Sequence, residues 1–177
     1  MALIDGDVLC YLAFEPRWLK NTDKFGITKV VLDDEGKPVP KVYTAEEDAI
    51  YLRQTYDRLK KNIRDLVDTL FCKDFMLAVQ GPDNFRALMY EDYKKSRGNY
   101  KPSEYSKFVP ILRKLLIKEG LAIPSIGMEA DDLLRIWARE CEEAGQEFVI
   151  ASIDKDLKCI PGTHYNIKKE EFEIVTK

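Results

Sequence analysis

The sequence is poor in the residues on which nucleophilic hydrolases depend. It contains one histidine in 177 residues and shows no serine–histidine or cysteine–histidine arrangement. A hydrolase with an activated serine or cysteine is therefore disfavoured, because such enzymes need an imidazole base beside the nucleophile. The cysteines are widely spaced and include no C-x-x-C pair, which argues against a zinc site and a disulfide framework; they are Cys10, Cys72, Cys141 and Cys159.

Signals for secretion and for membrane insertion are also missing from the sequence. The chain opens on Met1-Ala2-Leu3-Ile4 and reaches Asp5 at once, without the pattern of a signal peptide. No apolar run approaches the ~18 residues that a membrane span needs. Reduced cysteines, a cytoplasmic location and no membrane partner are therefore expected.

The composition is that of one ordinary globular domain. Hydrophobic residues make up 45% of the chain and charged residues 33%, and a chain of this length can bury a proper core. The net charge of −3 does not by itself indicate a nucleic-acid binder, although a whole-chain sum can conceal a basic patch beside an acidic site.

Acidic residues are concentrated in one short stretch. Glu129, Asp131 and Asp132 fall within four residues and precede an apolar run that begins with Leu133 and Leu134. Like charges so close repel one another and lose hydration on burial. Two interpretations remain open at this point. The acids begin a helix and interact with its dipole, or their oxygens hold a divalent cation.

Hydrophobic patterning predicts strands that alternate with helices. Short apolar runs predict strands at 1–4, 75–79, 122–124, 147–151 and 163–165. Periodic apolar residues predict helices at 45–71, 103–119 and 129–144. Thr44, followed by Glu47 three residues later, is a capping signature for the first of these helices. The expected fold class is α/β, with a mostly parallel sheet between helices, and residues 27–43 are expected to form a β-hairpin insertion.

Acidic side chains follow three of these elements. Asp5 and Asp7 come after the first strand, the 129–132 group opens the acidic helix, and Asp154 and Asp156 follow a later strand. In an open parallel sheet these positions share the carboxyl edge, where such sheets bind ligands. The convergence predicts a divalent-metal site suited to phosphodiester cleavage, because two ions ~4 Å apart can stabilise the attacking and leaving oxygens.

The segment after the strand at 75–79 is basic and aromatic. Its cations are interleaved with tyrosines, and Gly98-Asn99 interrupts any regular helix. Such a segment carries the groups that a clamp on the phosphate backbone needs. A solvated charged loop is the alternative interpretation. The cations are Arg86, Lys94, Lys95, Arg97 and Lys101.

Four motifs together resemble the 5′-nuclease family, which comprises phage 5′-to-3′ exonucleases, flap endonucleases and the nuclease domain of bacterial polymerase I. They occur in family order and cover nearly the whole chain: Leu3-Ile4-Asp5-Gly6-Asp7, Asn84-Phe85-Arg86 with Tyr93-Lys94-Lys95-Ser96-Arg97, Glu129-Ala130-Asp131-Asp132, and Ser152-Ile153-Asp154-Lys155-Asp156-Leu157-Lys158. The resemblance implies a PIN-like α/β fold, one catalytic domain over 1–177, and a helical-arch segment at 82–107.

The resemblance also implies an activity and a set of site residues. The activity is Mg²⁺- or Mn²⁺-dependent hydrolysis of DNA, and sometimes RNA, at 5′ ends or flaps during replication or DNA degradation. Arg86 and Lys94 are expected near the scissile phosphate, and Lys95, Arg97 and Lys101 on the nucleic acid. The metal ligands are expected to be Asp5, Glu129, Asp131, Asp132, Asp154 and Asp156. A monomeric protein with a replication protein as a further partner fits this resemblance. Its expected location is the host cytoplasm for a phage protein, or the bacterial cytoplasm.

Two departures from the family pattern bear on these expectations. The family usually has an aspartate just after the second long strand, where this chain has Gln80-Gly81 and then Asp83. The family also continues into a helix–three-turn–helix module and further metal-binding aspartates, whereas this chain stops at Lys177. The expectation is an intact first metal site, an incomplete second one, weak affinity for DNA and loose structure specificity.

Two other functions remain as alternatives. Asp5-Gly6-Asp7-Val8 fits the nucleophile and general acid of haloacid-dehalogenase-like phosphatases, although the acidic helix and the basic segment have no role in that chemistry. A non-catalytic nucleic-acid-binding module derived from the nuclease family is the second alternative. It differs from the nuclease in needing no metal ion for its activity.

Overall fold

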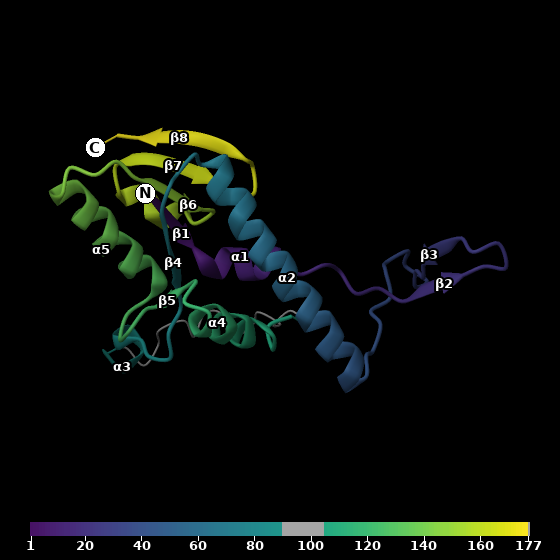
Figure 1. The fold of residues 1–177 in the computed structure, drawn as a ribbon. Helices are drawn as coiled ribbons and strands as arrows, with labels where there is room; N and C mark the ends of the chain where they lie inside the picture. Colours follow the sequence, from purple (N-terminus) through teal and green to yellow (C-terminus); the bar gives the residue numbers. More distant parts are fainter. Residues whose placement is uncertain (90–104, 177) are drawn as a thin grey trace.

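One central sheet organises the computed structural model of the chain, which describes residues 1–89 and 105–176 (Figure 1). The strands lie in the order β5-β4-β1-β6-β7-β8, and neighbours pair in parallel except for the antiparallel pair β7 and β8. This arrangement confirms the predicted α/β fold with a mostly parallel sheet. The strands are β1 Ala2–Asp5, β4 Phe75–Val79, β5 Ile123–Pro124, β6 Val149–Ser152, β7 Gly162–Asn166 and β8 Glu171–Val175.

Helices cover both faces of this sheet (Figure 1). On one face, α1 Gly6–Leu12, α2 Ala45–Thr69 and α4 Val109–Lys118 bury a core with Ile4 of β1. On the other face, α5 Ala130–Glu143 and the 3-10 helix η2 Lys155–Cys159 bury a second core with Leu3. Adjacent residues of β1 thus enter opposite cores, as the period-two alternation of a strand requires. The short α3 Phe85–Met89 follows the carboxyl end of β4.

Helix α2 begins as the sequence predicts. Thr44 Oγ1 accepts a hydrogen bond from the Glu47 backbone N–H at 3.2 Å, and the Glu47 carboxylate accepts one from the Thr44 N–H at 3.0 Å. This reciprocal pair satisfies two backbone donors at the helix start. Within the described parts of the chain, no helix combines the length and the apolar character that crossing a bilayer requires.

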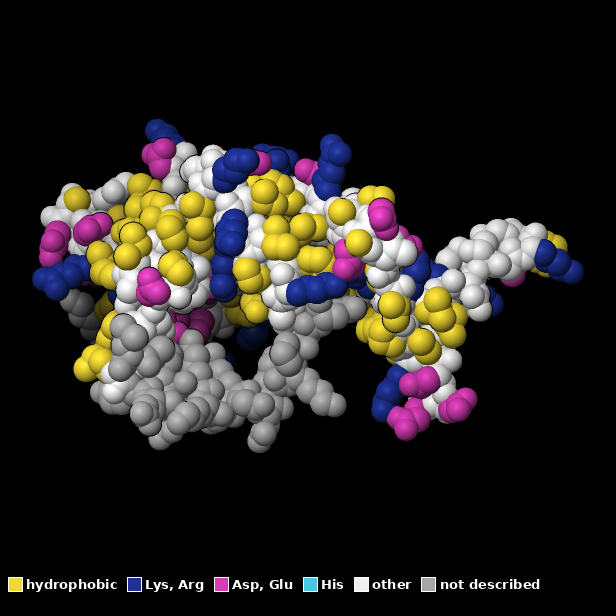
Figure 2. Space-filling view, turned by 90° about the horizontal axis from the view of Figure 1, so that it is seen from below, with side chains coloured by type: hydrophobic (Ala, Val, Ile, Leu, Met, Phe, Trp, Pro, Cys, Tyr) yellow, Lys and Arg dark blue, Asp and Glu magenta, His cyan; other side chains and the backbone are white. Residues whose placement is uncertain are grey.

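Residues 18–43 form an arm that stands apart from the body (Figures 1 and 2). Its regular ladder joins β2 Lys20–Thr22 to β3 Thr28–Val30, a pairing the sequence did not predict. The predicted partner of β3, the stretch 37–43, forms an antiparallel bridge between Leu32 and Pro38. Because Pro38 has no backbone N–H, it cannot contribute a donor to a longer ladder on that side.

The arm is fixed at its base by Arg17. The Arg17 guanidinium, which is 5% exposed, lies 3.3 Å from the ring centroid of Tyr43 and 4.2 Å from that of Tyr51. Its Nη1 atom lies 2.7 Å from Asp48 Oδ1, and Lys107 Nζ lies 2.6 Å from Asp48 Oδ2. Asp48 therefore joins the base of the arm to the chain just before α4.

Two elements differ from the sequence-based expectation. The helix predicted at 103–119 begins at Val109, with Pro110 in its first turn, where a missing N–H costs no helical hydrogen bond. Strand β8 was not predicted at all. It lies at the edge of the sheet with mostly exposed residues, so it lacks the apolar run by which a buried strand is recognised.

A close backbone contact fixes the loop after β4. The Gly81 N–H donates to Ser125 Oγ at 3.0 Å, and a Cβ atom on residue 81 would lie 1.8 Å from the Ser125 carbonyl oxygen. We expect Gly81→Ala to lower the free energy of unfolding by about 3 kcal/mol, because the backbone must move to relieve this collision. Urea denaturation measures the loss.

The matched control for this substitution is Gly120→Ala. Gly120 has a φ of +71° with open space around its Cβ position, so alanine there meets backbone strain alone. We expect a loss of about 1 kcal/mol at this position. Equal losses at the two glycines would contradict the steric explanation for Gly81.

Candidate functional site

The carboxyl end of β1 carries Asp5, the first predicted ligand. The parallel register pairs Ile4 with Ala151, which places Asp5 beside Ser152 at the end of β6. Asp5 is 5% exposed, and its Oδ2 accepts a hydrogen bond from Ser152 Oγ at 2.8 Å. Burial raises the pKa of the Asp5 carboxyl, although hydrogen bonds from Ser152 and the Val8 N–H oppose this shift. Because these donors are neutral, they supply no positive charge to balance the negative charge of the buried Asp5 carboxylate.

The start of α5 presents Asp131 to the same region. Glu129 is the N-cap of the helix, and Asp131 lies half-buried in its first turn. Burial, together with the negative charges of Asp5, Asp154 and Glu129, raises the pKa of Asp131 to about 6. Asp5 at the end of β1, Asp131 in the first turn of α5 and Asp154 after β6 thus belong to elements that meet at the carboxyl edge of the sheet.

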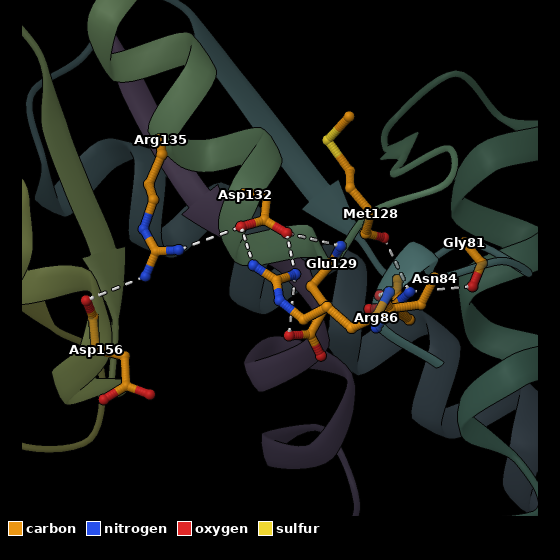
Figure 3. Close-up of polar contacts among 9 residues, drawn as sticks. Gly81, Asn84, Arg86, Met128, Glu129, Asp132, Arg135 and Asp156 are labelled. Atoms are coloured by element: carbon orange, nitrogen blue, oxygen red, sulfur yellow. Dashed lines mark hydrogen bonds and ion pairs between the residues drawn. The ribbon is translucent and has the colours of Figure 1, made fainter. Parts of the chain in front are cut away.

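The loop after β6 brings Asp154 to this group. The Asp154 N–H donates to Ser152 Oγ at 3.0 Å, and Asp154 Oδ1 accepts from the Asp156 N–H at 2.9 Å, which caps η2. Ser152 thus contacts both Asp5 and the Asp154 backbone. Asp156 is exposed, and its backbone oxygen accepts a hydrogen bond from Arg135 Nη2 at 3.4 Å (Figure 3).

Asp132 is surrounded by hydrogen-bond donors (Figure 3). Arg86 Nη1 donates to Asp132 Oδ2 at 2.5 Å, and Arg86 Nη2 donates to Oδ1 at 2.9 Å. Arg135 Nη1 also contacts Oδ1, at 3.2 Å, and the Glu129 N–H donates to Oδ2 at 3.1 Å. The hydrogen bonds from Arg86 hold the pKa of Asp132 below its usual value. The sequence predicted a metal ligand here, whereas the structure pairs Asp132 with two arginines.

Arg86 reaches these acids from α3. Its backbone N–H donates to Asn84 Oδ1 at 2.9 Å, and the neighbouring Phe85 N–H donates to the Gly127 oxygen at 2.8 Å. Its guanidinium Nη1 lies 3.5 Å from Glu129 Oε2. The structure therefore places Arg86 against the acidic helix start. The other predicted cations, Lys94, Lys95, Arg97 and Lys101, lie outside the described residues.

An ion pair beside the site involves Arg113, which sequence reasoning missed. Arg113 Nε and Nη2 each lie 2.8 Å from an oxygen of Asp7, and the Gln80 N–H donates to the same carboxylate at 3.3 Å. Arg113 lies 106 residues from Asp7 on a helix with other cations, so the sequence gives no signal for this pairing. Asp83, the acid that follows Gln80-Gly81 where the family usually has an aspartate, is exposed on the loop between β4 and α3.

The donor set at this edge suits a hard divalent cation. Asp5, Asp131 and Asp154 supply carboxylate oxygens, and their mutual repulsion is what a cation would neutralise. Across residues 1–89 and 105–176, no three Asp, Glu, His or Cys side chains are preassembled as a metal-binding set. The chemistry of the donors, rather than a preformed geometry, is what fits the ion.

Asp131 makes the metal-free protein less stable as the pH rises. Its native pKa of about 6 exceeds the value of about 3.9 expected in the unfolded chain, so the native state binds this proton more tightly. The resulting stabilisation is complete below about pH 4 and is lost as the pH rises to about 6.

The free energy of unfolding of Asp131→Asn, measured relative to wild type in EDTA, should therefore be higher at pH 7.5 than at pH 4. We expect a gain of about 1 kcal/mol, after discounting for solvent screening of a half-buried group. Urea denaturation of both proteins at the two pH values measures it. A difference that does not change with pH would contradict the electrostatic explanation.

Comparison with known families gives a match over the whole chain. Residues 1–177 match the family described as 5′-3′ exonuclease, N-terminal resolvase-like domain. The chain is 35% identical over 75 residues to a 5′-3′ exonuclease of Buchnera aphidicola, and 34% identical over 102 residues to DNA polymerase I of Streptococcus pneumoniae. The two matches cover 42% and 54% of this chain, but 26% and 12% of the relatives. The chain thus spans well under half the length of these proteins.

Solved structures of bacteriophage T5 proteins share the fold. The T5 5′-exonuclease with bound zinc ions matches with a TM-score of 0.62 at 12% identity, over 98% of this chain and 57% of that one. A T5 flap endonuclease in a pseudo-enzyme–product complex with DNA and metal ions matches with a TM-score of 0.59 at 11% identity, with the same two coverages. At such low identity, the likeness establishes the PIN-like architecture alone.

Proposed function

The chain belongs to the family of 5′-3′ exonuclease N-terminal resolvase-like domains, and from this premise we propose that it hydrolyses phosphodiester bonds in DNA with the help of a divalent cation. The proposed substrates are 5′ ends and flaps, and the proposed cation is Mg²⁺ or Mn²⁺. In this proposal, residues 1–177 act as one catalytic domain. Residues 90–104 of the arch segment expected at 82–107 lie outside the described residues.

One observation carries the proposal. Asp5, Asp131 and Asp154 come from three separate elements. The pKa of Asp131 is raised to about 6, mainly by burial and further by the negative charges of Asp5 and Asp154. Such repulsion costs stability, and a fold concentrates it where a ligand of opposite charge relieves it. The site is open at the carboxyl edge of the sheet, where Asp154 is exposed.

The residues of the site divide into two groups in the proposed reaction. Asp5, Asp131 and Asp154 would hold the cation, while Ser152 orients Asp5 through the 2.8 Å hydrogen bond. When bound, the cation supplies positive charge to the phosphate oxygens and a nucleophile near neutral pH. Arg86, on the other side of the acidic helix start, donates to the phosphate as negative charge develops on it. Exposed Asp156 has no role in this one-ion proposal.

Properties of the relatives support this assignment. The T5 5′-exonuclease holds zinc ions, and the T5 flap endonuclease is complexed with DNA and metal ions. Because the chain spans only part of its curated relatives, the activity, the substrates and the partners of those whole proteins come to this chain as proposals.

Cleavage of a 5′-labelled flap and of a plain single strand, in Mg²⁺, in Mn²⁺ and in EDTA, tests the function. We expect cleavage with either metal and none in EDTA. Binding of the flap without cleavage under any metal would favour the non-catalytic binding module. Cleavage that persists in EDTA would contradict the metal-dependent mechanism.

A further inference from the structure

Two adjacent acids at the start of α5 have opposite surroundings. Asp131 interacts mainly with the negative charges of Asp5, Asp154 and Glu129, and more weakly with Arg135. Asp132 instead binds Arg86 and Arg135 directly (Figure 3). Consecutive residues of a helix point about 100° apart. One helix start therefore presents one carboxylate to a negative region and the next to a positive region.

Both oxygens of Asp132 are engaged by donors. The guanidinium of Arg86 makes two parallel hydrogen bonds to them, at 2.5 and 2.9 Å, and Arg135 adds a contact at 3.2 Å. The Glu129 N–H completes the set at 3.1 Å. A divalent cation on these oxygens would have to displace or approach two guanidinium groups. Like charges at such separations repel strongly where water is partly excluded.

The same contacts restrict the Arg86 side chain. Two parallel bonds from a planar guanidinium to one carboxylate fix both the position and the plane of the group. Glu129 Oε2 lies 3.5 Å from Arg86 Nη1, and the backbone of Arg86 is tied to the Asn84 side chain. Without such partners, the guanidinium of an arginine has no fixed position or plane, because its long side chain has several rotatable bonds.

We propose that Asp132 is a positioning residue, which fixes the Arg86 guanidinium at the acidic start of α5 and does not ligate the cation. This inference rests on the proposed function, in which Arg86 donates to the substrate phosphate. It assigns the two neighbouring aspartates to different tasks, with Asp131 serving the cation and Asp132 serving the arginine. Asp132 acts on the reaction only through Arg86.

Direct binding of Mn²⁺ without any substrate separates the two aspartates. The free ion is followed by electron paramagnetic resonance as protein is added. Asp132→Asn keeps a side-chain oxygen for the Glu129 N–H but removes the charge that pairs with Arg86. We expect this variant to bind Mn²⁺ within about twofold of wild type, and Asp131→Asn to bind it more than about tenfold more weakly. A tenfold loss in Asp132→Asn would overturn the proposal.

A kinetic cycle tests whether Asp132 acts through Arg86. We expect Asp132→Asn to lower kcat about tenfold, Arg86→Ala to lower it about 100-fold, and the double variant to equal Arg86→Ala alone. A loss of kcat in the double variant equal to the product of the two single losses would show that Asp132 acts independently, and would overturn the proposal.

Arg86→Lys leaves the helix cap intact and keeps one charge, but cannot make two parallel bonds. We expect it to lose at least about tenfold in kcat, and wild-type kcat in this variant would also overturn the proposal.

Controls distinguish this inference from the function on which it rests. Glu143→Gln breaks an acid–arginine pair of 2.8 Å with Arg139 on the exposed end of the same helix, and we expect it to change neither Mn²⁺ binding nor kcat. If wild type binds Mn²⁺ but cleaves nothing, the proposed function fails, and the inference fails with it. If wild type cleaves and Asp132→Asn alone loses Mn²⁺, the function stands and the inference fails.

Discussion

Asp131→Ala is expected to abolish cleavage, with a loss of about 1,000-fold or more in kcat, while the chain remains folded. Asp131 carries the proposed cation together with Asp5 and Asp154, and burial among these charges gives it the raised pKa of about 6. Its removal takes away a ligand rather than a contact that shapes the fold. Alanine is a strong helix former, and it relieves repulsion at the start of α5.

Cleavage of a 5′-labelled flap in saturating Mg²⁺ measures the loss, and urea denaturation in EDTA checks the fold. We expect a free energy of unfolding for Asp131→Ala at pH 7.5 that is equal to or above that of wild type. Glu143→Gln, at the exposed end of the same helix, is the control and should keep wild-type turnover. Wild-type turnover in Asp131→Ala would contradict the assignment of Asp131 as a ligand of the catalytic cation.

The placement of these acids at one edge of the sheet was readable from the sequence, because it depends on chain order and sheet topology. Each strand that leads to an acid is an apolar run, and parallel strands bring their carboxyl ends to one edge. Asp5 ends β1, Asp154 follows the adjacent strand β6, and Asp131 lies at the start of the helix that packs against these strands. The resemblance to the 5′-nuclease family is consistent with the match over residues 1–177.

The different partners of the two neighbouring aspartates were not readable in this way. Asp131 and Asp132 have the same chemistry, and they differ only in the partners that the fold supplies. Arg86 lies 46 residues before Asp132 and reaches it through the orientation of α3, which is set by backbone contacts to Asn84 and Gly127. Local patterns do not encode such a long-range pairing, so the sequence gives no sign that, within the described residues, Asp132 contacts arginines while Asp131 does not.

Features outside the core were predicted less well for a related reason. The signal for a buried strand is an apolar run, and β2, β3 and β8 are mostly exposed. Their positions are set by turns and by backbone pairing. In the arm, Asp23 Oδ1 accepts hydrogen bonds from the Phe25 and Ile27 N–H groups, which closes the turn between β2 and β3. A short turn of this kind can be formed by many sequences.

Arg86→Ala is expected to slow the chemical step while leaving binding nearly unchanged. Charge on the phosphate increases in the transition state, so a fixed guanidinium stabilises that state more than the bound substrate. We expect kcat to fall about 100-fold and KM to change less than about threefold. Single-turnover cleavage of the 5′-labelled flap at several substrate concentrations separates the two constants.

The surroundings of Arg86 make this loss specific and distinguish it from unfolding. Its removal frees Asp132 and Glu129 from a guanidinium at 2.5 and 3.5 Å, which adds repulsion to an edge already crowded with carboxylates. Stability in EDTA should therefore fall in Arg86→Ala, whereas it should not fall in Asp131→Ala. Arg139→Ala, an exposed arginine on α5, is the matched control and should change neither constant. A rise in KM with unchanged kcat would mean that Arg86 contributes to substrate binding alone. It would contradict the role of Arg86 in stabilising the transition state.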